Sequence, residues 1–189
     1  MNKLITLLLA LVLCPLTLSA QGKRYHGDGI DNVLEYVPLV ATFTLKGCGV
    51  ESASSWKRLA VDGAFSIGIT AGTTYLLKHT INDMRPDRTD NHGFPSGHTA
   101  VAFCGARMLD KEFRHVSPWI SVAGYTVATV TAVDRVRRNR HHWDDVVVGA
   151  AIGIAATEAG YWLGDKLTDE RSRWHLGTDG QTLSLRIDL

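Results

Sequence analysis

The fold is decided by the segment 59-LAVDGAFSIGITAGTTYLL-77, an apolar run in which Gly, Ala, Ser and Thr recur at close intervals. Helices that pack closely need such small residues, and membrane helices need them most. Further apolar runs of this kind lie at 33–45, 99–109, 116–133 and 146–163. Pro118, near the start of one of them, suits the first turn of a helix. We therefore predict an all-α fold, a helical bundle of about five core helices.

Other features of the sequence concern the domain organisation, the C-terminal tail and the cysteines. No internal repeat or linker divides the chain, so a single domain is expected. Residues 183–189 alternate apolar and polar side chains, which indicates a short strand or an ordered edge in the C-terminal tail. Cys48 and Cys104 do not form a disulfide framework, and a buried thiol is the expectation for Cys104.

The first twenty residues have the features of a secretory signal. A positive start is followed by an apolar core at 4–13 and by small residues at 18–20, with cleavage expected after Ala20. Leu13 before Cys14 argues against a lipoprotein signal. The signal predicts a bacterial cell envelope protein.

The arrangement of charges suggests a membrane bundle. Helices placed alternately up and down would bring 78–98 and 135–145 to one end, on the periplasmic side. The opposite end would collect the cations expected on the cytoplasmic side, namely Lys46, Lys57, Arg58, Lys111, Arg114 and Lys166. Three runs approach the ~20 residues that a span requires. We predict an inner-membrane protein with a periplasmic site, and a soluble periplasmic bundle is the alternative.

Basic residues that suit phosphate binding are spread along the chain. Lys78, Arg85 and Arg135 can donate charge-assisted hydrogen bonds to phosphate oxygens. Ser96 precedes an apolar run and is expected to cap a helix whose first N–H groups attract anions. Gly97 would let the backbone approach a ligand closely.

Two histidines complete this set. His141 and Asp145 are four residues apart, so on a helix they would share one face. The carboxylate would then hold one ring nitrogen while the other remains a nucleophile. With His98 nearby, the pattern predicts phosphoryl transfer through a covalent histidine, without a metal.

These residues fall into three spaced motifs. They are Lys78-HTINDM-Arg85-Pro86, then Pro95-Ser96-Gly97-His98, then Arg135-VRRNR-His141-HWD-Asp145. The chain thereby resembles the type 2 phosphatidic acid phosphatase (PAP2) and vanadium haloperoxidase superfamily, whose motifs read KxxxxxxRP, PSGH and SRxxxxxHxxxD. One position departs from this pattern, since Asp134 stands where the family has serine.

The resemblance implies the role of each residue. His141 would attack phosphorus, Asp145 would orient it, and His98 would protonate the leaving oxygen and later activate water. The phosphate-binding residues would be Lys78, Arg85, Ser96, Gly97 and Arg135. The domain boundaries that follow are a signal peptide at 1–20, a PAP2-type phosphatase domain at 21–167 and a tail at 168–189.

The expected function is hydrolysis of a lipid phosphate or pyrophosphate. A soluble periplasmic non-specific acid phosphatase and a non-catalytic membrane bundle or lipid-binding protein are the alternatives. A zinc cluster drawn from His92, His98, His141, His142 and Asp145 is disfavoured because the surrounding arginines repel a cation, so no metal or other cofactor is expected. A net charge of +1 also argues against a nucleic-acid partner.

Overall fold

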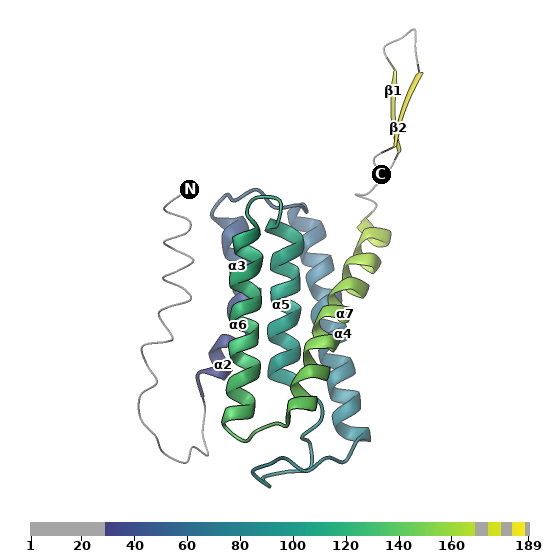
Figure 1. The fold of residues 1–189 in the computed structure, drawn as a ribbon. Coiled ribbons are helices and arrows are strands. Elements are labelled where there is room, and N and C mark those ends of the chain that lie inside the picture. Colours follow the sequence, from purple (N-terminus) through teal and green to yellow (C-terminus); the bar gives the residue numbers. More distant parts are fainter. Residues whose placement is uncertain (1–28, 169–173, 179–182, 188–189) are drawn as a thin grey trace.

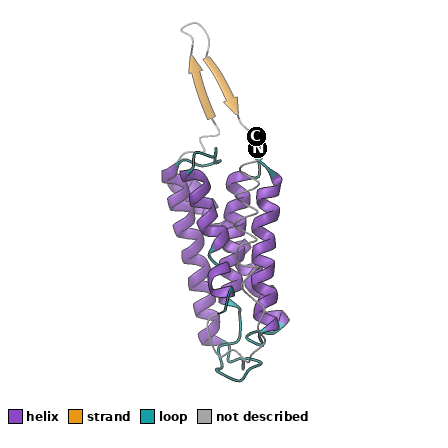
Figure 2. Cartoon of the chain, turned by 90° about the vertical axis from the view of Figure 1, so that its left-hand side faces the viewer, coloured by secondary structure: helices purple, strands orange, loops and turns teal. Residues whose placement is uncertain are grey.

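The computed structural model describes residues 29–168 and two strands beyond them. The predicted signal peptide and its cleavage site lie outside the described residues. The described helices are α2 (Asp31–Leu34), α3 (Val37–Gly47), α4 (Trp56–Thr80), α5 (Gly97–Phe113), α6 (Pro118–Arg137) and α7 (Trp143–Thr168). The long helices lie side by side as a bundle (Figures 1 and 2). The predicted all-α bundle with about five core helices is confirmed.

The run predicted at 33–45 is interrupted, because α2 ends at Leu34 and α3 starts at Val37. Pro38 lies in the first turn of α3. Proline has no N–H to donate to the carbonyl four residues back, and its ring clashes with that carbonyl, here Leu34. The break allows α2 to leave the axis of α3 and reach the end of α6, as Figure 1 shows.

Helix α5 lies in the middle of the bundle (Figure 1). Its Cys104 and Met108 pack in one buried cluster with Leu59 of α4 and Tyr161 of α7. Other residues of α5 pack against α3 and α6 in a second cluster. Cys104 is a buried free thiol, as expected, and Cys48 is an exposed one.

Glycines let α7 approach its neighbours closely. A Cβ built on Gly153 would lie 2.3 Å from the carbonyl oxygen of Ala100 in α5. One built on Gly160 would lie 2.6 Å from the backbone nitrogen of Ser66 in α4. Only residues without a side chain fit at these contacts, which explains the glycines of α7, whereas Gly68 and Gly72 of α4 have no neighbour within 4 Å.

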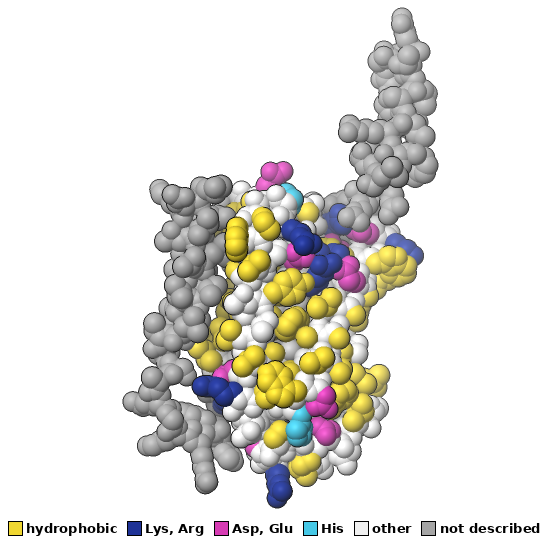
Figure 3. Space-filling model, viewed as in Figure 1, with side chains coloured by type: hydrophobic (Ala, Val, Ile, Leu, Met, Phe, Trp, Pro, Cys, Tyr) yellow, Lys and Arg dark blue, Asp and Glu magenta, His cyan; other side chains and the backbone are white. Residues whose placement is uncertain are grey.

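Large apolar side chains cover much of the outer surface of the bundle, and Figure 3 shows them spread along one side. They include Val40, Ile67, Leu76, Trp119, Val122, Val130, Trp143, Val147, Trp162 and Leu167. Within the described residues, α7 is the one helix long and apolar enough to cross a membrane. Helices α4 and α6 are long enough, at 25 and 20 residues, but they are not apolar enough over that length.

The strands form a hairpin after the bundle. β1 (Trp174–Thr178) pairs antiparallel with β2 (Leu183–Ile187). The alternation at the C-terminus is thus a strand over 183–187. Its partner β1 was not predicted, since WHLGT shows no clear alternation of polar and apolar residues.

Candidate phosphate-binding and catalytic site

The predicted site residues all lie at one end of the bundle. At this end α4 and α6 finish and α5 and α7 begin, and the loops 81–96 and 138–142 connect them (Figure 1). The charges of Lys78, Arg85 and Arg135 act on both His98 and His141. The fold therefore brings the three sequence motifs together, and the basic residues predicted for the opposite end lie there.

His141 and Asp145 are paired across the start of α7. The Nδ1 atom of His141 lies 3.4 Å from Oδ2 of Asp145. The same oxygen accepts a hydrogen bond of 2.8 Å from the backbone N–H of His142, as an acid at the third helical position does in a capping box. The two residues were expected on one face of a helix. Instead, His141 precedes the helix and Asp145 reaches back to it.

The Ser96-Gly97-His98 segment forms the start of α5. Ser96 is its N-cap, and its hydroxyl accepts a hydrogen bond of 3.4 Å from the N–H of Thr99. Its own N–H donates to the carbonyl oxygen of Asp145, 3.0 Å away. A Cβ on Gly97 would be no closer than 3.5 Å to its neighbours, so packing leaves space there. The helix start and the His141–Asp145 pair are thus tied together.

The predicted phosphate ligands keep part of their hydrogen-bonding capacity. Arg85 donates through Nε to Asp90, at 2.8 Å, but its Nη1 is buried without a hydrogen-bond partner among the described residues. Arg135 donates through Nη1 to Asp31, and its buried Nε similarly has no partner there. Lys78 donates to the carbonyl oxygen of His92, 2.9 Å away. Buried donors of this kind are costly unless an acceptor occupies the site at some stage.

Asp134, which departs from the family motif, does not pair with Arg135. Its Oδ1 lies 3.3 Å from Nε of Arg137, while Arg135 pairs with Asp31. Consecutive residues of a helix point about 100° apart, so the two side chains face different neighbours. Asp134 leaves the Nε of Arg135 available.

Helix α2 and its C-cap residue Glu35 add three polar residues that the motifs do not contain. Nε2 of His98 lies 2.8 Å from Oδ1 of Asn32 and 3.6 Å from Oε1 of Glu35. Asp31 is fully buried and accepts from Arg135 and Arg138. The signal that could have revealed them is a pair of acids, four residues apart, at the start of an apolar run.

Burial keeps both histidines neutral. It lowers the pKa of His141 well below its ordinary value, and the positive charge of Arg135 lowers it further. Burial and the charge of Arg135 also lower the pKa of His98 to about 4. A neutral His141 is a nucleophile without prior loss of a proton.

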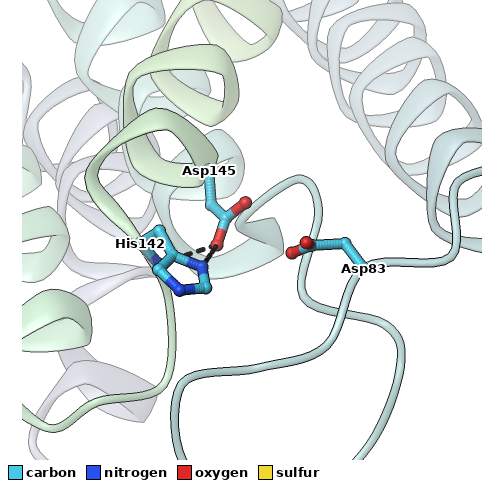
Figure 4. A group of neighbouring side chains, drawn as sticks. All are labelled: Asp83, His142 and Asp145. Carbon is cyan, nitrogen blue, oxygen red and sulfur yellow. Dashed lines mark hydrogen bonds and ion pairs between the residues drawn. The ribbon is translucent and has the colours of Figure 1, made fainter.

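Among the described residues, Asp83, His142 and Asp145 could offer ligand atoms to a cation. These atoms lie within 4.8 Å of one another, and Figure 4 shows Asp83 facing the other two from the loop 81–96. The positive charge of Lys78 acts on Asp145 and opposes a cation here. Two residues of this group, His142 and Asp145, also belong to the zinc cluster considered from the sequence.

Comparison with known proteins identifies the family. The model of the PAP2 superfamily matches residues 59–169. This chain belongs to the PAP2 superfamily. The resemblance inferred from the three motifs is thereby confirmed.

One curated protein and one solved structure are similar to this chain. The chain is 43% identical over 148 residues to a lipid A 1-phosphatase of Porphyromonas gingivalis, a match that covers 75% of this chain and 33% of that protein. The chain thus spans about a third of the length of this curated relative. The crystal structure of Aquifex aeolicus LpxE has the same fold, with a TM-score of 0.53 at 21% identity, covering 80% of this chain and 93% of that one.

The PAP2 match begins within α4 and continues through α7. It therefore includes every residue of the three motifs and leaves out α2 and α3. The contacts of α2 with His98 and Arg135 come from outside the part of the chain that defines the superfamily.

Proposed function

We propose that this PAP2 protein is a metal-independent phosphatase that hydrolyses a lipid phosphate or pyrophosphate through a phosphohistidine. The observation that carries the proposal is the meeting of His141, His98 and the buried, partly unpaired donors of Arg85 and Arg135 at one end of the bundle. The name of the Porphyromonas gingivalis relative makes lipid A the first substrate to test.

The reaction takes place in two steps. The ring nitrogen Nε2 of His141 attacks phosphorus as the bond to the leaving oxygen breaks, and protonated His98 gives its proton to that oxygen. Asp145, whose Oδ2 lies 3.4 Å from Nδ1 of His141, would accept a hydrogen bond from the Nδ1–H as the ring becomes positive, and would stabilise it. Water then attacks phosphorus, His98 takes the proton from water, and the P–N bond breaks to release phosphate and neutral His141.

The phosphate oxygens would be bound by Lys78, Arg85, Arg135 and the N–H groups after Ser96. Such fixed donors match the charge of the five-coordinate transition state without reorganisation. They replace the charge neutralisation that metal ions provide in other phosphoryl-transfer enzymes. The bound phosphate group of the substrate is negatively charged. It therefore favours the imidazolium form of His98 and raises the pKa of this residue.

We also propose that the enzyme resides in the inner membrane with its site facing the periplasm. The apolar outer faces of the bundle and the length of α7 support this location. The site end, including the first turns of α5 and α7, would project from the bilayer, and the basic opposite end would face the cytoplasm. The signal peptide at 1–20 and the domain limits at 21–167 remain predictions.

The experiment is a phosphate-release screen with purified protein in detergent. The substrates are lipid A, phosphatidic acid, phosphatidylglycerol phosphate, undecaprenyl pyrophosphate and soluble p-nitrophenyl phosphate. We expect release from at least one lipid, and His115→Ala, an exposed change at the opposite end, serves as the control. Release from p-nitrophenyl phosphate alone, by protein that leaves washed envelopes without detergent, would establish the soluble acid phosphatase instead. No release from any substrate would refute the proposal.

A further inference from the structure

We propose that α2 and its C-cap residue Glu35 belong to the catalytic site: Asn32 and Glu35 hold Nε2 of His98 so that its Nδ1 serves as the acid and base. This inference rests on the proposed phosphatase function and extends it to a helix that the PAP2 match does not include. Asn32 and Glu35 act through His98, so they are positioning residues.

The first argument is the hydrogen bond to Asn32. Its Oδ1 lies 2.8 Å from Nε2 of His98, and a carbonyl oxygen accepts hydrogen bonds only. The proton of a neutral His98 is therefore held on Nε2. The lone pair is left on Nδ1, which is the nitrogen that can take a proton from water and give one to a leaving group.

The second argument is the carboxyl group of Glu35. It lies 3.6 Å from the same Nε2 and is almost completely buried. When Nδ1 takes a proton, the ring becomes an imidazolium, whose charge Glu35 can balance. During the cycle, the proton on Nδ1 passes to the leaving oxygen and is replaced by one from water. The proton on Nε2 stays on that nitrogen and remains hydrogen-bonded to Asn32.

The third argument is that α2 is fixed in place by charge. Asp31, which precedes Asn32, is fully buried between Arg135 and Arg138 of the α6 end. A Cβ on Gly29 would collide with the guanidinium of Arg138, so the chain before α2 lies directly against it. The same carboxylate thus anchors α2 and orients the phosphate ligand Arg135.

The burial of Glu35 has a cost that packing does not explain. Burial raises the pKa of Glu35 to about 7, against the opposing charge of Arg135 and with the added repulsion of Asp31. Tyr36 and His98 are the other ionisable groups near it. A carboxyl group that opposes folding when ionised is more simply explained by a role in the reaction than by one in stability.

The activity test compares two variants of Asn32 that are similar in size. Asn32→Asp keeps an oxygen for Nε2 of His98, whereas Asn32→Leu removes it. We expect Asn32→Leu to lower kcat by ~10-fold or more, part of the 10²–10⁴-fold contribution of a general acid, with little change in KM. Asn32→Asp should retain most of the kcat. Equal activity of Asn32→Leu and wild type would overturn the proposal.

For Glu35 the test is the pH profile. Glu35→Gln should lower kcat for an alkyl phosphate and displace the pH dependence of phosphoenzyme formation, while Glu51→Gln, an exposed change in a distant loop, should do neither. If Glu35 had only a structural role, its substitution would change stability and leave the pH dependence of phosphoenzyme formation unchanged. An unchanged profile in Glu35→Gln would therefore contradict the proposal.

A measurement without turnover separates this inference from the proposed function. Nitrogen-15 NMR of histidine-labelled protein reports which ring nitrogen of His98 carries the proton. We expect the Nε2–H form in wild type and a mixture in Asn32→Leu, with His98→Gln used to assign the signal. If the protein shows this result but hydrolyses no substrate, the proposed phosphatase function is refuted, whereas the inference about the tautomer of His98 still holds. A Nδ1–H form in wild type would overturn the inference.

Discussion

Neutral His141 is the residue on which the proposed chemistry depends, and its removal is the first prediction. His141→Ala should reduce turnover to background, because the proposed phosphohistidine forms on this ring. Labelled substrate should trap an acid-labile phosphoprotein in wild type and none in this variant. His142→Ala, which changes an exposed neighbour, should keep the intermediate. A folded His141→Ala protein with substantial turnover would rule out this nucleophile.

His98 is predicted to act differently on different leaving groups. An alkoxide is strongly basic and needs a proton, whereas p-nitrophenolate leaves without one. His98→Ala should therefore slow phosphoenzyme formation from an alkyl phosphate by about 10²–10⁴-fold and from p-nitrophenyl phosphate far less. Single-turnover kinetics isolate this step from the later attack of water. Equal losses for both substrates would mean that His98 binds phosphate and is not the acid.

Glu35 leads to a prediction on stability. Its pKa is about 7 in the folded protein, against 4.5 for an ordinary glutamate. Between these pH values the folded state binds more protons than the unfolded state, so the contribution of Glu35 to stability is present below pH 4.5 and is lost as pH rises through 7. Glu35→Gln should remove this loss, on the order of 3 kcal/mol.

The measurement is thermal unfolding in detergent at pH 5 and pH 8. Glu35→Gln should gain stability relative to wild type at pH 8 more than at pH 5, and Glu51→Gln should follow wild type at both. The neutral His98 and His141 act in the opposite direction, since their low pKa values make the protein lose stability as pH falls below about 6.5. A Glu35→Gln curve parallel to that of wild type would show that Glu35 is not protonated at neutral pH.

At the level of the helices, the site depends on how closely α7 approaches α5. Gly153→Ala would place a methyl group 2.3 Å from the carbonyl oxygen of Ala100. We expect it to destabilise the protein by about 1–3 kcal/mol, as overpacking does. Because α5 and α7 also supply His98 and Asp145, kcat of Gly153→Ala should fall together with its stability.

The matched control is Gly72→Ala in α4. A Cβ there has nothing within 4 Å, so the alanine should stabilise the helix by about 0.5–1 kcal/mol. Both changes are from glycine to alanine within a helix and have the same effect on backbone entropy. The difference between their free energies of unfolding therefore reports the packing contact alone. Melting temperatures of the two variants that move in the same direction would disprove the close contact between α5 and α7.

For the whole molecule, the prediction concerns metal ions. Three fixed cations provide the positive charge of the site, so activity should survive EDTA, and vanadate should inhibit because it adopts the five-coordinate geometry of the transition state. Asp83→Asn, which changes a possible cation ligand at a variable position of the first motif, should not make activity dependent on metal. Loss of activity in EDTA and its return with zinc or magnesium would make the group in Figure 4 a catalytic metal site.

Local sequence signals were enough to predict the helices and the motif residues. Ser96 before an apolar run predicts the start of α5, and Pro118 the start of α6, because capping and proline geometry depend on residues within one turn. The spacing of Lys78, His98 and His141 within the helix order also predicted their meeting at one end. These features depend on contacts between residues that are near in the chain or belong to recognisable motifs.

Contacts across the bundle could not be predicted in this way. His98 meets Asn32, which is 66 residues away, and Arg135 meets Asp31, which is 104 residues away. The acids Asp31 and Glu35 at the start of an apolar run mark this segment locally. They do not show which residues it meets, since the pairing arises when Pro38 breaks the helix and α2 packs against α6. Likewise, His141 lies before α7 because Asp145 caps that helix. The sequence therefore identifies the reacting groups, whereas tertiary packing selects the partners that set their protonation and orientation.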